Sequence, residues 1–443
     1  MKPGHPVVLV ILDAFRADYL DPQDTPELFR LAAEGTHVRA LATSPGFTQK
    51  TAIFTGAPPS ETECFLMFHH DPEDAVFRDL GWRAPLWEGA EGLLRGLARR
   101  LDRLPGRLSR AGAIRARAAV AATLARYVRP GVTLATPGNI PRRLLGRFST
   151  SEDKRGSTPD PGSLPVDSLF DRLRAAGFSY EYHAHPVACG PNEVVLAAAR
   201  RALAAPPAEF YVFHFNQTDN EIHFTGTSRE TRRAVLASVD RGAAELIQLF
   251  RARVPDATFL FLGDHGMTDV KVRIDLMRPL LGRLARAGLA AGREILYFLD
   301  STLARFWFRN ERARALVLEF LNEPPAAGHG RILSAEDLAA AGAPLDPRHG
   351  ELIWAADLGV LISPCFFHVE ETTAGGLLRR PIAMHGYFSD DPTTRGMAIV
   401  HGPGVPRRRV ESATIYDAAP TLARLLGVES PARSRGRSWV DGP

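Results

Sequence analysis

Continuous apolar runs, rich in β-branched and aromatic residues, alternate along the chain with longer amphipathic segments. Residues 7–12, 211–215 and 258–262 are apolar at nearly every position, as expected of strands covered on both faces in a parallel sheet. Helical spacing of apolar residues precedes the second run, at 193–205, and the third run, at 229–253. This alternation predicts an α/β protein with a doubly wound, mainly parallel sheet and helices on both faces.

Changes in composition divide the chain into a core and two further parts. Between 85 and 163 the sequence is dominated by Arg, Ala, Leu and Gly, with arginines placed between apolar residues at helical spacing. We interpret 85–163 as a helical insertion or cap, with a set of solvated helices as the alternative. Strand-like segments around a helix beginning near Glu311 predict a small α+β subdomain at 293–374. The core then comprises 1–84, 164–292 and 375–443, and its last part includes a strand in 395–405 and a helix in 414–427.

The composition is that of a globular protein with ample material for a large core. The 443 residues are 45% hydrophobic and 23% charged, so disorder is not expected. The three cysteines are far apart and lack a CxxC spacing, which argues against a disulfide framework or a thiolate zinc site. The N-terminal apolar run is interrupted by Asp13, and no apolar stretch reaches about 20 residues. We therefore expect a first strand rather than a signal peptide, no spanning helix and a cytoplasmic location.

Acidic and imidazole side chains follow the predicted strands at the edge of the sheet where ligands gather in doubly wound folds. Asp264 and His265 end the third run directly, and Asp219 stands one helical turn before His223. Taken singly, such residues more often form salt pairs or loop hydrogen bonds than metal sites. Taken together, three carboxylates and three imidazoles match the ligands of two divalent ions with oxygen and nitrogen coordination. The six residues are Asp13, Asp219, His223, Asp264, His265 and His385.

Two metal ions about 4 Å apart can clamp an in-line displacement at phosphorus, which also requires a nucleophile. The loop at 45–47 and a helix expected from 51 to 55 place Thr48 near a helix N-terminus, where positive potential favours an anionic phosphoryl group. Metal binding would lower the pKa of its hydroxyl and activate it, whereas an N-cap is the alternative role. Lys50 is a candidate to contact a phosphoryl oxygen as a point charge, or else a solvated helix residue.

The ordered set of motifs resembles the alkaline phosphatase superfamily, especially its type I phosphodiesterase and nucleotide pyrophosphatase branch. The set begins with the acid after the first strand and a hydroxyl before IFTGAPPSE. It continues with the acid and imidazole of TDNEIH, followed by GDHGM and HGY, and it extends to about Gly404. The resemblance implies an alkaline-phosphatase-like fold and two divalent ions, with Zn²⁺ as the first choice and Mn²⁺ as the alternative. It assigns one ion to Asp219, His223 and His385, and the other to Asp13, Asp264, His265 and the nucleophile Thr48.

One departure from the family pattern concerns the nucleophile. Family members commonly place it further from the TG dipeptide, in a register that falls on Gly46 here. Because glycine has no hydroxyl, we assign the role to Thr48 and infer a shortened loop. The lesser candidates are Thr43, Ser44 and Thr51.

These features predict a two-metal phosphoric ester hydrolase that acts on small-molecule substrates. We expect a phosphodiesterase or nucleotide pyrophosphatase working through a covalent phospho-threonine intermediate, with a phosphomonoesterase or manganese-dependent phosphomutase as the alternative. A further alternative is a non-catalytic protein that binds anionic membranes or nucleic acid. The net charge is +4, and the stretch from Arg99 to Arg110 lacks aromatic residues between its arginines for base stacking. No specific nucleic acid is therefore expected, while peripheral membrane contact stays open for the arginines, among them Arg99, Arg100, Arg103, Arg107 and Arg110.

The remaining polar clusters are not placed by any motif. Asn216 and Gln217 are more typical of helix capping than of phosphoryl binding. The pair of histidines in MFHHDPED follows the nucleophile helix and is the one most worth checking at the substrate entrance. We treat the unplaced histidines as ordinary surface or pocket residues; they are His69, His70, His183, His185 and His368.

Overall fold

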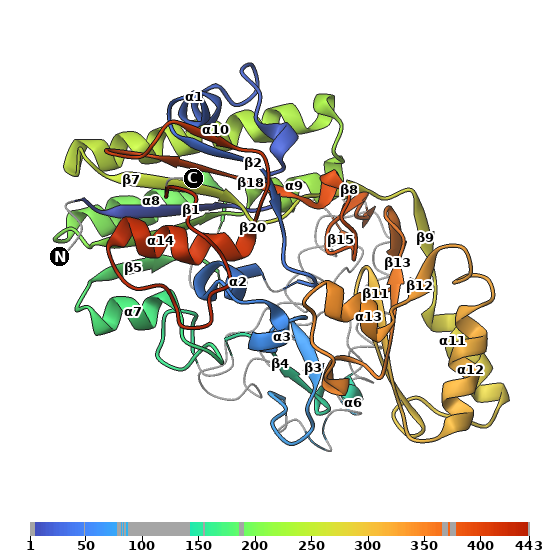
Figure 1. Cartoon of the computed structure of the whole chain (residues 1–443). Helices are drawn as coiled ribbons and strands as arrows, with labels where there is room; N and C mark the ends of the chain where they lie inside the picture. The colour runs from blue at the N-terminus through green and yellow to red at the C-terminus, as the bar shows by residue number, and fades with distance from the viewer. Residues whose placement is uncertain are drawn as a thin grey trace.

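A computed structural model describes residues 5–47, 49–77, 142–153, 156–185, 190–365 and 378–441, with positions 81, 83, 86, 371 and 372. Its largest element is an eight-stranded sheet in the order β19-β2-β18-β7-β1-β6-β5, with β20 beside β2 (Figure 1). Only β18 runs antiparallel to its neighbours in this sheet, which is therefore mainly parallel, as predicted. The strands are β1 Val7–Leu12, β2 Thr36–Ala42, β5 Tyr180–His183, β6 Phe210–Phe215, β7 Thr258–Gly263, β18 Gly396–His401, β19 Arg408–Val410 and β20 Ala413–Thr414.

Helices cover both faces of this sheet, which confirms the predicted fold class (Figure 1). Val10 of β1 packs in the layer of α1, α8 and α10, whereas Leu9 and Ile11 pack in the layer of α2, α7 and α14. Because both layers are present, β1 is buried at every position, which explains its unbroken apolar sequence. The helices are α1 Pro26–Glu34, α2 Gln49–Thr55, α7 Leu169–Ala175, α8 Asn192–Ala204, α10 Arg229–Arg253 and α14 Ala418–Leu426.

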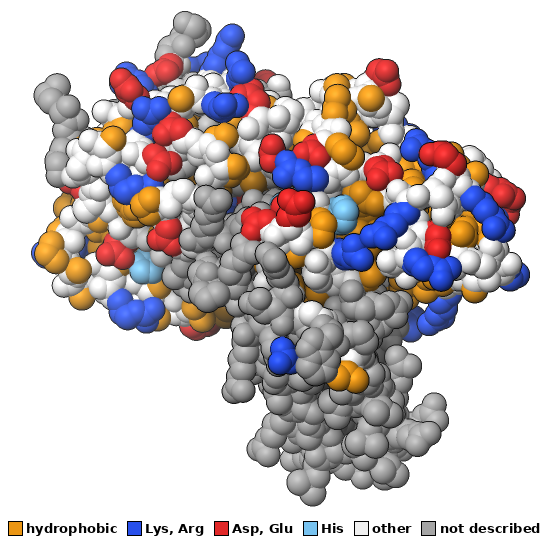
Figure 2. All heavy atoms as spheres, turned by 90° about the horizontal axis from the view of Figure 1, so that it is seen from below, with side chains coloured by type: hydrophobic (Ala, Val, Ile, Leu, Met, Phe, Trp, Pro, Cys, Tyr) orange, Lys and Arg blue, Asp and Glu red, His pale blue; other side chains and the backbone are white. Residues whose placement is uncertain are grey.

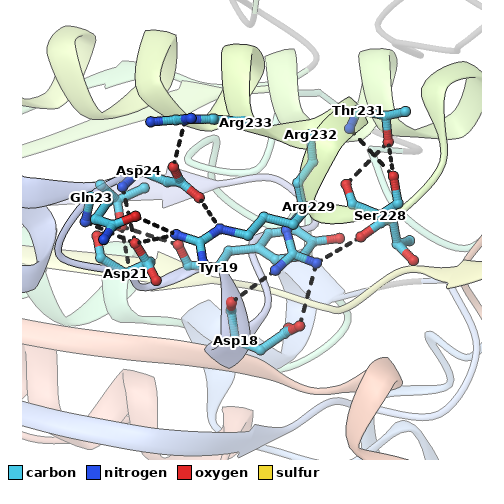
Figure 3. Close-up of polar contacts among 12 residues, drawn as sticks. Asp18, Tyr19, Asp21, Gln23, Asp24, Ser228, Arg229, Thr231, Arg232 and Arg233 are labelled. Atoms are coloured by element: carbon cyan, nitrogen blue, oxygen red, sulfur yellow. Dashed lines mark hydrogen bonds and ion pairs between the residues drawn. The ribbon is translucent and has the colours of Figure 1, made fainter.

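A polar network fixes the segment after β1 to the start of α10 (Figure 3). Asp24 is buried and pairs with the side chains of Arg229 at 2.9 Å and Arg233 at 3.0 Å. The guanidinium of Arg232 lies 4.6 Å from the centre of the buried Tyr19 ring, within the range of a cation–π contact. These contacts restrict the path of the chain as it leaves the carboxyl end of β1.

A smaller lobe with its own sheet lies beside the main sheet (Figure 1). Its four strands follow the order β10-β11-β13-β12, and α11 and α12 share a core with them around Tyr297, Phe306 and Trp354. The lobe has the α+β character predicted for 293–374, although α11 precedes that range. Its elements are β9 Val272–Ile274, α11 Met277–Arg286, β10 Ile295–Leu299, β11 Leu303–Phe308, α12 Glu311–Leu321, β12 Gly330–Ile332, α13 Ala335–Ala340, β13 Leu352–Ala356 and β14 Val360–Ile362.

Short elements surround the carboxyl edge of the main sheet. β14 pairs with β9, β17 with β8, β15 with β16 and β3 with β4. The helix α9 follows β6 after a single residue, and it contacts β17. These elements are α3 Pro59–Thr62, β3 Phe68–His70, α6 Arg142–Leu145, β4 Phe148–Thr150, α9 Gln217–Thr225, β8 Thr268–Asp269, β15 Glu371–Thr372, β16 Leu378–Arg379 and β17 Ala383–Met384.

The arginine-rich segment lies largely outside the described residues. Residues 87–141 are not among them, so the helical cap, its contact with membranes and the domain boundaries stay predictions. The end of the segment is described, and there β4 pairs antiparallel with β3 of the first core part. On the face shown in Figure 2, acidic and basic side chains of the described residues are interspersed. None of the described helices is both long enough and apolar enough to cross a membrane.

Candidate active site

The carboxyl ends of β1 and β7 place two acids side by side. These two strands are paired in parallel, with Leu12 opposite Gly263, so the residues that follow them leave the sheet at the same edge. Asp13 comes next after β1, where its backbone N–H donates to the Phe215 oxygen at 2.9 Å. Asp264 follows β7, and its Oδ1 accepts a hydrogen bond from the backbone N–H of Ala14 at 3.2 Å. Neighbouring parallel strands therefore bring together two acids that lie 251 positions apart in the sequence.

The first predicted ligand group forms around His265. Its Nε2 lies 3.3 Å from Asp13 Oδ1 and 3.9 Å from Asp264 Oδ2. One ligand atom from each of these three residues lies within 4.8 Å of the other two. This spacing allows one ion to contact all three residues, as the resemblance implies.

The second ligand group forms around Asp219 on α9. Asp219 Oδ1 lies 3.3 Å from His223 Nε2, one turn later, and 3.6 Å from His385 Nε2, which follows β17. The rings of His265 and His385 stack with their centres 4.1 Å apart, so the two groups are contiguous. Ligand atoms of Asp219, His265 and His385 also converge within 4.8 Å. His265 thus stands between the two groups, whereas the resemblance placed it in one.

Backbone carbonyls orient two of the imidazoles. His223 Nδ1 lies 2.8 Å from the Ala383 oxygen, and His265 Nδ1 lies 3.0 Å from the Gly266 oxygen. A carbonyl only accepts hydrogen bonds, so each Nδ1 carries a proton, and each Nε2 points toward the carboxylates, where it can bind a metal ion once its own proton is lost. Histidines that bind metals are typically held in this manner.

The electrostatics of the cluster suit a divalent cation. Burial by itself raises the pKa of Asp13, but His214 and His265 outweigh it and hold that pKa well below its usual range. Burial raises the pKa of Asp264 to about 6. Burial lowers the pKa of His265, yet Asp264 and Asp13 raise it to about 10. Asp219 Oδ1 is buried and receives no hydrogen bond from the described residues. Buried acids and an unsatisfied buried oxygen fit a site that binds a cation.

The loop before α2 explains the departure from the family register at Gly46. Gly46 has a φ of 83°, and a Cβ at this position would lie 1.9 Å from the Phe65 oxygen. No side chain, and hence no hydroxyl, fits there. Next along the chain, the ring of Phe47 lies 5.6 Å from the ring of His385, so the loop reaches the ligand cluster. Thr48 follows Phe47 and lies outside the described residues, so its assignment stays a prediction.

Two of the lesser nucleophile candidates are engaged in other contacts. The Oγ of Ser44 accepts a hydrogen bond from the Tyr416 hydroxyl at 3.2 Å. The hydroxyl of Thr51 donates to a carboxylate oxygen of Glu152, which also accepts the backbone N–H of Thr51 at 2.9 Å. Both contacts favour Thr48 over these alternatives.

Lys50 is enclosed by acids from a distant loop. Its ammonium contacts the Asp153 carboxylate and lies 3.8 Å from Glu152 Oε2, and its side chain is 14% exposed. Burial lowers the pKa of Lys50, but these acids outweigh it and raise the pKa. The alternative that Lys50 is a solvated helix residue is therefore wrong. No short-range pattern indicates this contact, because Asp153 lies 103 positions after Lys50.

One site residue was missed altogether. His214 lies next to the last residue of β6, and its Nε2 is 3.0 Å from Asp13 Oδ2. The available signal was a single histidine inside the apolar run FYVFHF.

Of the other histidines singled out, His185 contacts His214 through its backbone N–H at 3.5 Å, and the rest lie away from the ligand cluster or outside the described residues. His69 contacts Ser151 at 3.1 Å and His70 packs against Trp307, both on the side of β3 and the smaller lobe. His183 stacks on Phe213, and His368 is outside the described residues. Asn216 is the N-cap residue of α9, but its side chain makes no capping hydrogen bond, and Gln217 is the first residue of the helix.

Carboxylates and imidazoles gathered at the edge of an alkaline-phosphatase-like sheet define a hydrolase of phosphoric esters. The chain belongs to the type I phosphodiesterase / nucleotide pyrophosphatase family, whose sequence profile matches residues 7–387. Family membership implies the use of divalent metal ions, and the residues at this site fit them.

Solved structures of known proteins show the same fold. Human ectonucleotide pyrophosphatase / phosphodiesterase 5 is 16% identical, with a TM-score of 0.65 over 98% of each chain. The murine protein of that name, as an inactive threonine-to-alanine variant in complex with AMP, is 15% identical, with a TM-score of 0.64 over 98% of each chain. A second murine structure is 16% identical, with a TM-score of 0.62 over 96% of each chain. No curated protein matches the chain.

Proposed function

We propose that this chain hydrolyses phosphodiesters or pyrophosphates through a covalent intermediate on Thr48, with two divalent ions, Zn²⁺ first, held by the predicted ligands. The observation that carries the proposal is the convergence of two ligand groups through His265, beside a loop that leads directly to Thr48. The ions, when bound, would lower the pKa of the attacking hydroxyl and stabilise charge on the phosphoryl oxygens.

The chain's own residues would then support two displacements. In the first, the Thr48 oxygen forms a bond to phosphorus as the bond to the leaving oxygen breaks, and the hydroxyl proton passes to solvent. In the second, water attacks the phospho-threonine and gives up a proton, and the threonine oxygen leaves and takes up a proton, so that two in-line steps retain configuration at phosphorus. The ligands on α9 and those that follow β1 and β7 directly are attached to rigid elements, which preserves this geometry through both steps.

The charges beside the nucleophile loop favour a diester over a monoester. Lys50 is the basic residue closest to Thr48 in sequence, and it is already paired with Asp153 and Glu152. A paired ammonium offers less attraction to a dianionic monoester than a free one would. The complex of the murine neighbour with AMP supports a substrate that bears a nucleotide.

The expected result is a ranking of three chromogenic substrates. We expect bis-p-nitrophenyl phosphate and a p-nitrophenyl nucleotide to be hydrolysed faster than p-nitrophenyl phosphate, by about tenfold or more in kcat/KM, which corresponds to about 1.4 kcal/mol. Release of p-nitrophenolate is the measurement. A chelator should stop it and added Zn²⁺ should restore it.

Other outcomes select the alternatives. Fastest turnover of the monoester would contradict the diester proposal in favour of a phosphomonoesterase. No p-nitrophenolate from any substrate, with or without Zn²⁺ or Mn²⁺, would contradict hydrolysis itself and leave a phosphomutase or a binding protein.

A further inference from the structure

We propose that His214 is a positioning residue that determines which oxygen of Asp13 is offered to a metal ion. The inference rests on the proposed two-metal function and adds a residue that the family motifs do not include. His214 Nε2 lies 3.0 Å from Asp13 Oδ2, at hydrogen-bond distance. The contact joins a residue within β6 to the residue that follows β1.

The backbone determines which ring nitrogen of His214 carries the proton. The N–H of His185 points at His214 Nδ1 with an N–N distance of 3.5 Å. Because a backbone N–H only donates, Nδ1 is the acceptor in this contact. The proton of the neutral ring is then on Nε2, and it is donated to Asp13 Oδ2.

This hydrogen bond leaves the other oxygen of Asp13 for the ligand cluster. Asp13 Oδ1 faces His265 Nε2 at 3.3 Å. Asp264 is held in a similar way, because its Oδ1 accepts hydrogen bonds from the backbone N–H groups of Ala14 at 3.2 Å and His265 at 3.0 Å. Each acid of this group therefore has one oxygen held by protein donors and one oxygen turned toward His265.

His214 is placed to support a ligand rather than to serve as one. Its Nε2 contacts Asp13 Oδ2, whereas the oxygen that faces the ligand cluster is Asp13 Oδ1. Its side chain is 12% exposed, and in the paired strands it stands opposite Ile11, two positions before Asp13. A donor on a buried strand of the main sheet holds the carboxylate with little freedom to swing, and such outer contacts typically change metal affinity by about 10- to 100-fold.

The test replaces His214 in the whole chain by two amide residues whose side chains differ in length. In His214→Gln the amide nitrogen lies near the position of Nε2 and keeps a donor for Asp13, whereas in His214→Asn it stops short. Zn²⁺ affinity is measured by competition with a chromophoric chelator, without any substrate. We expect His214→Asn to weaken the binding of the ion at the Asp13 group by about 10- to 100-fold. The affinity of His214→Gln should stay near that of the wild type.

A matched control removes a histidine from the next strand. His183→Asn alters β5, where the ring stacks on Phe213 and does not contact the ligand cluster. Its Zn²⁺ affinity should equal that of the wild type. Far-UV circular dichroism and the thermal midpoint of each variant establish that the fold is kept.

The outcomes separate the two proposals. If the wild-type chain binds no Zn²⁺ or Mn²⁺, the proposed function fails. If the wild type binds two ions and His214→Asn binds them equally well, the role of His214 is refuted while the proposed function stands. Equal losses in His214→Gln and His214→Asn would refute the donor role, since only in His214→Asn is the donor out of reach of Asp13.

Discussion

Replacement of Thr48 by alanine is expected to reduce kcat on a phosphodiester by about 1,000-fold or more, because it removes the oxygen that forms the covalent intermediate. Turnover of bis-p-nitrophenyl phosphate by the purified variant is the measurement. The predicted ligands contributed by the other residues remain, so most of the bound Zn²⁺ should be retained. Retained metal with lost turnover would separate the loss of a nucleophile from the collapse of the site.

Ser44→Ala is the matched control for Thr48→Ala. It also removes one hydroxyl from the same loop, but this hydroxyl is buried and bonded to Tyr416. Its turnover should remain within a few-fold of the wild type. Full activity of Thr48→Ala would contradict the assignment of the nucleophile, and so would a loss of activity in Ser44→Ala instead. The choice of Thr48 also depends on Gly46, where the Phe65 oxygen leaves no room for any side chain.

The main sheet could be predicted because its signal is local. Burial of both faces of β1 requires apolar residues at every position, and the run at 7–12 records that requirement directly. The helix predicted at 229–253 begins and ends at those residues in α10, where Ser228 caps the first turn. The order of the strands in the sheet has no such local signal in the sequence. The antiparallel β18 lies between β7 and β2, and this placement depends on packing between distant segments.

The candidate site could be predicted where its residues stand next to strand ends or share a helical turn. Asp264 and His265 are adjacent, and Asp219 and His223 are separated by one turn, so each pair is visible in a short window. The contact of Lys50 with an acid 103 positions later has no such signature.

The role of His214 could not be predicted from the sequence either, for a different reason. A histidine within a buried strand is compatible with simple packing, and its function depends on Asp13 of the neighbouring strand. Pairing of β1 with β6 was needed to bring the two side chains together.

A buried ion pair lies within the smaller lobe, and its arginine also binds a carbonyl of β3, so the pair predicts a large stability effect. Arg305 and Asp300 are both fully buried, and Arg305 Nε lies 2.8 Å from Asp300 Oδ2. Arg305 also donates to the Phe68 oxygen at 2.8 Å and to the His349 oxygen at 3.4 Å. The charge of Arg305 is thus compensated mainly by one carboxylate, while its remaining donors bind neutral carbonyls.

Asp300→Asn is expected to lower the free energy of unfolding by about 3 kcal/mol or more, because it leaves the Arg305 charge buried without its counter-ion. Burial raises the pKa of Asp300 to about 6, so the experiment is done at pH 8, where the wild-type carboxyl is ionised. Urea unfolding followed by tryptophan fluorescence gives the change. Glu245→Gln is the control, because its pair with Arg200 is about half exposed and should contribute no more than about 1 kcal/mol. Equal effects of the two substitutions would show that the buried carboxylate does not compensate the Arg305 charge.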